Sequence, residues 1–347
     1  MAIDWSAVKS TSIREAFRRA LSDDKHLSHV EVVEVMRSVM ADGDLDEQEI
    51  ADLKKVAETS ETIPERSKQM IENLAYDAYL TWGYGTINVS TSRQRYAAEL
   101  IFSFMKRMGA PVFPRLDRDR VGIDLLLRVS NPNIINQRQA GLCGPVSFLY
   151  SLALDSPAMY AKYAIDLYEK GKASIGRMEI EPSYDCRHYF PPAPISPGDW
   201  LTAGSLRDSE NILFDYESVD NDGSATNADL ARWFSRAGYT DIHADDNITF
   251  SRDASDIALV NGYYNAGYRV ALRINSKLLY PSKRNDSSHR GNHFVVLRAP
   301  IAVSGDAVTL TVYTWGMGQT RVPEPGAQLS KSGFLEHWYG YVVGKPF

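Results

Sequence analysis

Three side chains in this sequence are of the types that thiol-based acyl transfer requires. Cys143 precedes Gly144 and an apolar run, 146–154, that is typical of a buried helix. A cysteine at a helix N-terminus lies beside free backbone N–H groups and the positive end of the helix dipole, which favour a thiolate. We therefore expect Cys143 to act as a nucleophile. His293 heads the strand-like run 294–297 and is expected to take the proton from the thiol.

The third side chain is Gln137, six residues before the cysteine. A side-chain amide can donate a hydrogen bond to the oxyanion that forms when a thiolate attacks a carbonyl group. Gln139 is the alternative for this role, because it lies in the same stretch before Cys143.

The order of glutamine, five residues, Cys-Gly and a distant histidine at the head of a strand resembles that of papain-like cysteine peptidases. This order resembles the bacterial, bacteriocin-processing type of the fold as much as the plant and lysosomal type. The resemblance implies an α+β fold, in which a nucleophile helix precedes an antiparallel sheet that carries the histidine. It also implies that Cys143 attacks the carbonyl carbon, His293 moves the proton and Gln137 helps to hold the oxyanion.

The same resemblance implies a third member, an Asn or Asp on the strand after the histidine, that orients the imidazole. The next expected strand is 307–315, and the matching position holds Tyr313. Asp306 lies at the far end of that strand. The orienting group is therefore left open between Tyr313, Thr314 and a backbone carbonyl.

Two alternative functions would use the same residues. Transglutaminase-like cross-linking or deamidation of protein glutamine also needs a cysteine and a histidine, with a well-placed aspartate after the histidine. A papain-like scaffold that binds a partner without catalysis is the second alternative. For an enzyme of either kind, the expected substrate is a protein or peptide.

Composition excludes several classes of protein. The chain has 347 residues, enough for two domains, and a formal net charge of −6, which argues against a nucleic-acid partner. No apolar run approaches the ~20 residues of a membrane-spanning helix. The N-terminus has neither a basic segment nor an apolar segment of a secretory signal. We expect a cytoplasmic protein, or one delivered by a route that uses no such signal.

The sequence contains two cysteines, Cys143 and Cys186. A disulfide between them is possible, but it would block the expected nucleophile. Cys186 lies two residues before His188, yet zinc needs three or four ligands and no second pair has a suitable spacing. We therefore expect a structural role for Cys186, no metal and no cofactor.

The chain is expected to divide into a helical N-terminal domain, 1–112, a linker, 113–130, and a papain-like catalytic domain, 131–347. The front third shows apolar residues at helical spacing throughout. The linker is expected where a charged run follows two prolines. In the rear part, helices come first and strands follow at 268–274, 293–301, 307–315 and 339–343, an α+β order.

An acidic segment in the front domain, Asp42-Gly43-Asp44-Leu45-Asp46, places aspartates at alternate positions as a calcium loop does. The glycine and glutamate that such a loop requires at its sixth and twelfth positions are missing. The segment instead resembles the turn of tellurite-resistance-type helical domains, and Asp46 with Glu49 has the spacing of a capping box. We predict a structural turn.

A helical front domain joined to a papain-like rear domain also resembles some bacterial effector or toxin proteins. This resemblance implies a host or competitor target and a dedicated inhibitor or immunity protein as a partner.

Overall fold

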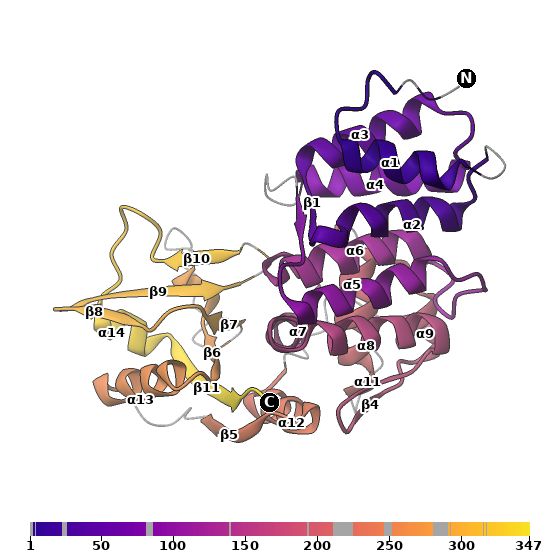
Figure 1. Cartoon of the computed structure of the whole chain (residues 1–347). Helices are drawn as coiled ribbons and strands as arrows, with labels where there is room; N and C mark the ends of the chain where they lie inside the picture. Colours follow the sequence, from indigo (N-terminus) through magenta and orange to yellow (C-terminus); the bar gives the residue numbers. More distant parts are fainter. Residues whose placement is uncertain are drawn as a thin grey trace. The chain divides into compact units, whose positions relative to one another are not determined.

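The computed structural model describes residues 3, 5–22, 26–80, 86–138, 140–192, 194–210, 225–245, 252–279, 291, 293–314, 316 and 318–347. It combines helices with an antiparallel sheet, as expected of an α+β protein (Figure 1). Two compact units are formed. Unit 1 comprises Met1–Pro132 and Ser156–Gly171, and unit 2 comprises Asn133–Asp155 and Lys172–Phe347.

Unit 1 is helical, as predicted for the front of the chain. Its helices are α1 (Thr11–Ala20), α2 (His29–Val39), α3 (Glu47–Thr59), α4 (Glu65–Leu80), α5 (Ser92–Met105), α6 (Arg118–Ser130) and α8 (Pro157–Lys170), with a short 3₁₀ turn, η1 (Met40–Asp42). A small antiparallel ribbon pairs β1 (Asp44–Leu45) with β2 (Ile87–Asn88).

Side-chain caps fix the starts of these helices. The capping box predicted at Asp46 is confirmed, because its carboxylate accepts from Glu49 N–H while the Glu49 side chain accepts from Asp46 N–H. The acidic segment is therefore a turn that ends in a helix cap. Helix α5 begins with a second capping box, in which the Thr91 side chain accepts from Gln94 N–H and the Gln94 side chain accepts from Thr91 N–H.

The segment expected to be a linker, 113–130, is largely the buried helix α6. Asp117 accepts from Arg120 N–H as the cap, and apolar residues then recur at helical spacing. The charged run that suggested a linker is the first turn of this helix. Arg118 is itself buried and pairs with Glu169 at 2.8 Å.

Helix α8 belongs to unit 1, although the sequence placed it in the rear domain. Tyr168 packs edge-on against Phe104 of α5, with ring centroids 5.2 Å apart, and its hydroxyl donates to Leu116 O at 3.0 Å. The chain therefore leaves unit 1, forms one helix of unit 2 and returns before it completes unit 2.

Unit 2 is built on a curled antiparallel sheet with the strand order β10-β9-β7-β6-β11-β5. The strands are β5 (Thr240–Asp245), β6 (Arg269–Ile274), β7 (His293–Leu297), β9 (Ala307–Tyr313), β10 (Gln319–Val322) and β11 (Trp338–Lys345), and β8 (Ala302–Ser304) pairs with β9. A separate hairpin pairs β3 (Ala173–Ile175) with β4 (Met178–Ile180). Four of these strands lie where the sequence predicted strands.

The helices of unit 2 are α7 (Cys143–Asp155), α9 (Tyr184–His188), α10 (Pro197–Asp199), α11 (Ser205–Glu210), α12 (Asn227–Ala237), α13 (Ala254–Asn265) and α14 (Lys331–Glu336). A π-helical turn, η3 (Trp200–Gly204), joins α10 to α11, and two 3₁₀ turns are η2 (Pro132–Ile134) and η4 (Ser276–Leu278). π-helical turns inside helices are frequent at functional sites.

Two apolar layers cover the sheet. Tyr150 of α7 stacks on Tyr313 of β9, with ring centroids 3.6 Å apart, so α7 packs on the face that Tyr313 presents. Residues two apart along a strand share a face. Val312 therefore faces the other way, into a core that α13 and α14 complete through Val260 and Phe334. None of the helices in the described part of the chain is long and apolar enough to cross a membrane.

Candidate active site

Cys143 is the first residue of α7, as its sequence context predicts. Gly144 allows this helix start to pack closely, because a Cβ at that position would lie 2.4 Å from Ala225 Cβ. A side chain larger than hydrogen would therefore push the helix away from its neighbours. The backbone N–H groups of Cys143 and Gly144 both favour the charged sulfur.

The Cys143 sulfur also accepts a hydrogen bond from Phe294 N–H. Phe294 is the second residue of β7 and follows His293 directly in the chain. Ser147, one helical turn after Cys143, donates to Phe294 O at 3.5 Å. The first turn of α7 is thus fixed against Phe294, the residue that follows His293, although the two segments are about 150 residues apart in sequence.

His293 is the first residue of β7 and pairs in register with Ile274 of β6. Its Nε2 lies 2.7 Å from the Thr314 hydroxyl, at hydrogen-bond distance. Thr314 follows the last residue of β9, so the two groups come from neighbouring strands of the sheet. The Thr314 contact thus fixes the ring at Nε2.

The orienting group left open by the sequence can now be compared with the structure. Thr314 contacts the imidazole, whereas the Tyr313 hydroxyl donates to Ile135 O at 2.5 Å. Asp306 lies just before β9, at the opposite end of that strand from Thr314. The hydroxyl of Thr314 therefore occupies the place where the resemblance expects an amide or a carboxylate.

Gln137 lies in a loop that is fastened to the end of β9. Besides the Tyr313 bond to Ile135, Asn136 N–H donates to the buried Asp199 carboxylate at 3.1 Å. Gly316 approaches this loop so closely that a Cβ would lie 2.6 Å from Asn136 Cβ. The loop that precedes the cysteine is thus held beside the residues that follow Thr314.

The Gln137 side chain is buried, and its Oε1 has no hydrogen-bond partner within the described residues. Two neighbouring residues adopt left-handed backbone conformations, Arg138 at φ 52° and Gly141 at φ 62°. Such a conformation costs free energy in a residue other than glycine, and strained residues of this kind concentrate at functional sites. Gln139 lies outside the described residues.

Burial governs the protonation states of the site. Each of four side chains is at most 7% exposed: Cys143, His293, Gln137 and Thr314. Burial raises the pKa of Cys143, although the N–H donors of Phe294, Gly144 and Cys143 and the positive charge of Arg207 oppose it. Burial also lowers the pKa of His293 to about 3. Both groups are therefore neutral at pH 7, whereas the helix dipole alone predicts a thiolate.

Cys186 is separate from this arrangement. Both cysteines are free, so the possible disulfide does not form in this structure. His188 Nδ1 donates to Tyr184 O at 2.8 Å and its ring stacks on the Tyr184 ring, which accounts for a local structural role. Across the residues that the structure describes, no group of three or more His, Cys, Asp or Glu side chains could hold a metal ion.

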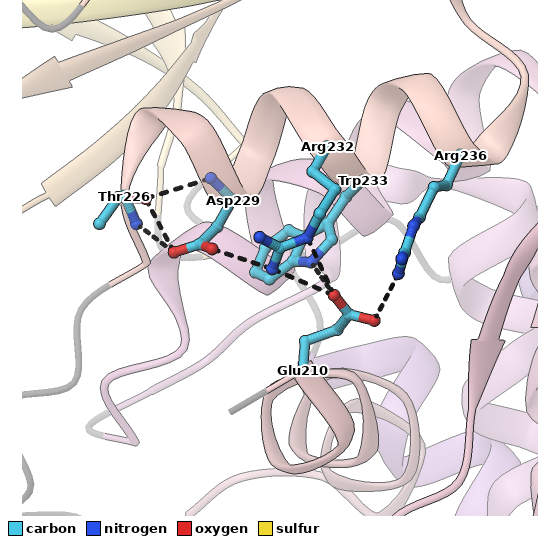
Figure 2. A network of polar contacts seen from close by, with 6 residues as sticks. All are labelled: Glu210, Thr226, Asp229, Arg232, Trp233 and Arg236. Carbon is cyan, nitrogen blue, oxygen red and sulfur yellow. Dashed lines mark hydrogen bonds and ion pairs between the residues drawn. The ribbon is translucent and has the colours of Figure 1, made fainter. Parts of the chain in front are cut away.

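A polar network behind α7 holds two helices together (Figure 2). Glu210, the last residue of α11, accepts hydrogen bonds from three side chains of α12: Arg232, Trp233 and Arg236. Trp233 packs against Phe148 of α7, with ring centroids 6.1 Å apart. The charge of Glu210 thus fixes the aromatic side chain that supports the cysteine helix.

Sequence reasoning missed three contributors to the site. Phe294 contributes only its backbone N–H, which carries no signal in the residue type. Asp199 contributes a buried carboxylate and Arg207 a buried cation. Asp199 is the last residue of α10, and Arg207 lies in α11. A charged residue on the apolar side of such a helix is the one signal that could have drawn attention to them.

Comparisons with protein-family models, with curated proteins and with solved structures found no match for this chain.

Proposed function

We propose that this chain is a cysteine peptidase of papain-like fold that hydrolyses amide bonds by thiol acyl transfer. The observation that carries the proposal is the contact between α7 and β7. The Cys143 sulfur accepts from Phe294 N–H, and the adjacent residue, His293, has its Nε2 held by Thr314. The proposed nucleophile, base and orienting group thus lie on three segments that contact one another, α7, β7 and the residue after β9.

The proposed reaction begins when His293 Nδ1 takes the thiol proton. The Cys143 sulfur then attacks the carbonyl carbon of the substrate amide, and the carbonyl oxygen becomes an oxyanion. Cys143 N–H and the Gln137 amide donate to that oxygen. His293 returns the proton to the departing amine as the C–N bond breaks, and water hydrolyses the thioester. Loss of one oxyanion donor typically costs about 3 kcal/mol of transition-state stabilisation.

Proton transfer from the buried thiol to the buried imidazole creates a negative and a positive charge, and the protein must stabilise both. The N–H donors around the sulfur and the cation of Arg207 stabilise the thiolate. The thiolate and the imidazolium also stabilise each other. We propose that substrate binding completes the stabilisation of these charges. The carbonyl oxygen of the substrate amide would accept hydrogen bonds from donors that are otherwise buried.

The test is cleavage of a complex peptide mixture, with products identified by mass spectrometry. Wild-type protein should generate new termini, and Cys143→Ala and His293→Gln should generate none. Cys186→Ala is the matched control, because it removes the other buried thiol, and it should cleave as the wild type does. Equal cleavage by wild type and Cys143→Ala would refute the proposal.

A non-catalytic scaffold is the second candidate, and the closed site favours it. All four proposed site residues are buried, and burial opposes both charged forms. A scaffold requires neither a reactive thiol nor turnover, so the same peptide experiment separates the two candidates. In the transglutaminase or deamidase alternative, the thiol attacks the side-chain amide of a protein glutamine. Transfer to an added amine would then appear as a new cross-link on that glutamine, and transfer to water would convert it to glutamate.

We further propose that the target is a foreign protein and that an inhibitor or immunity protein protects the producing cell. This proposal rests on the resemblance to effector and toxin proteins. If it holds, wild-type protein made in the bacterial cytoplasm should stop growth, and the Cys143→Ala variant should not. Normal growth with both proteins would count against a toxin.

A further inference from the structure

Two tyrosines stack between the cysteine helix and the strand that precedes Thr314. Tyr150 of α7 and Tyr313, the last residue of β9, lie face to face, with ring centroids 3.6 Å apart and ring planes inclined by 2°. Both side chains are at most 1% exposed. The pair therefore joins α7 directly to the end of β9 in the buried part of unit 2.

The hydroxyl groups of this pair hold the segment that carries Gln137. Tyr313 donates to Ile135 O at 2.5 Å, and Tyr150 donates to Asn133 Oδ1 at 3.2 Å. The Gln137 side chain is not fastened through its own acceptor, because its buried Oε1 has no hydrogen-bond partner within the described residues. The position of the Gln137 amide therefore depends on the backbone that the two tyrosines hold.

Tyr313 also precedes Thr314, whose hydroxyl contacts the His293 imidazole. One residue thus relates three parts of the proposed site. Its ring contacts α7, its hydroxyl holds the segment of Gln137, and its main chain leads into Thr314. The ring and the hydroxyl can be tested separately, because phenylalanine keeps the ring and lacks the hydroxyl.

We infer that Tyr313 is a positioning residue for the oxyanion donor: its hydroxyl places the Gln137 amide and takes no part in activating the thiol. The inference rests on the proposed function, in which Gln137 donates to the oxyanion. A misplacement of about 1 Å can lower a catalytic rate by about 100-fold, even when the altered residue does not touch the substrate.

The test compares two reactions of the Cys143 thiol. In acylation by p-nitrophenyl acetate, the sulfur bonds to the carbonyl carbon, an oxyanion forms, p-nitrophenolate leaves and the thiol proton goes to His293. In alkylation by iodoacetamide, the sulfur displaces iodide from a saturated carbon and no oxyanion forms. Mass spectrometry of the peptide that contains Cys143 gives both rates. Only the acylation rate therefore depends on the oxyanion donors.

Tyr313→Phe should lower the acylation rate by about tenfold or more and leave the alkylation rate within about twofold of the wild type. Gln137→Ala should have the same pattern. Since Tyr313 acts through Gln137, the double variant should acylate no more slowly than Gln137→Ala alone. Tyr268→Phe removes a hydroxyl that donates to Asp241, and as the control it should change neither rate.

Tyr150→Phe serves as a second variant if Tyr313→Phe does not fold, as judged by circular dichroism. It removes the other hydroxyl that holds the segment, so it should also slow acylation more than alkylation. Equal losses in the two rates, an unchanged acylation rate, or additive losses in the double variant would overturn the inference and leave the proposed function standing. If wild-type Cys143 gains no acetyl group, the proposed function fails and the inference falls with it.

Discussion

At the scale of single residues, the hydroxyl of Thr314 stands where an amide or a carboxylate is expected. A hydroxyl can both donate and accept, so it holds the imidazole without adding charge. This has two consequences. The hydrogen bond of 2.7 Å orients the ring through Nε2, and within the part of the chain that the structure describes no carboxylate raises the pKa of His293.

Thr314→Ala should reduce the alkylation rate of Cys143 by about five- to tenfold, because one hydrogen bond contributes about 1 kcal/mol. Thr314→Ser keeps the hydroxyl and should react within about twofold of the wild type. The rates are measured with iodoacetamide and mass spectrometry. A serine variant as slow as the alanine variant would show that the threonine methyl group, and not its hydroxyl, supports the ring.

His293 also makes stability depend on pH. Its pKa is about 3 in the native state, whereas an unfolded histidine has a pKa near ~6.5. Between these values the unfolded chain binds the proton and the native protein does not, so acid favours unfolding. Stability should fall by about 1.4 kcal/mol for each pH unit below ~6.5 through this residue alone.

The measurement is urea unfolding, followed by tryptophan fluorescence, at pH 7, 6 and 5. His293→Gln cannot gain a proton, so its unfolding free energy should decline less steeply over this range than that of the wild type. If the unfolding free energy depended equally on pH in the two proteins, His293 would titrate normally in the native state and would not be buried as described.

At the scale of elements, the cysteine helix depends on its neighbours. Glu210 accepts from Trp233 Nε1 at 3.2 Å, and Trp233 is buried against α7 (Figure 2). Glu210→Ala should lower the unfolding free energy by about 1–3 kcal/mol, because the indole N–H loses its partner in a buried place. Thermal unfolding followed by circular dichroism measures the change.

Glu181→Ala is the control for this prediction, because Glu181 is an exposed glutamate of the same unit. It should change stability by less than about 0.5 kcal/mol. An equal effect of both substitutions would mean that the network of Glu210 contributes no more than a surface charge does.

The elements themselves could be predicted well where local signals are strong. The cysteine helix and four strands lie close to their predicted positions. The helix at 118–130 was missed because its first turn is rich in charge, although Asp117 and the following apolar spacing were visible. Its buried Arg118 pairs with Glu169 of α8, which lies about 50 residues further along the chain. The local sequence pattern does not reveal such a distant partner.

The site could be predicted only in part. The residue types and their order pointed to Cys143, His293 and Gln137, but the contact of His293 with Thr314 depends on the pairing of β7 with β9. The neutral state of the thiol follows from burial, which is a property of the whole fold. The helix start alone predicted the opposite direction for its pKa.

At the scale of the whole molecule, the chain passes three times between its two units. Helix α8 belongs to unit 1, although it follows α7 of unit 2 in the chain. A fragment of residues 1–132 therefore lacks Tyr168 and Glu169, the partners of Phe104 and Arg118. We expect this fragment to unfold without a cooperative thermal transition, as measured by circular dichroism. A cooperative transition at the temperature of the full chain would contradict this dependence.

The central claim is that Cys143 and His293 act as one chemical unit. The most direct test is the alkylation rate of Cys143 by iodoacetamide between pH 5 and 9, with Cys186 in the same protein as the reference thiol. The account predicts that Cys143 reacts faster than Cys186 across this range, because the N–H donors and Arg207 favour its thiolate and His293 accepts its proton. The His293→Gln substitution should remove this advantage. Equal reactivity of the two thiols, unaffected by His293→Gln, would contradict the account and leave a binding scaffold.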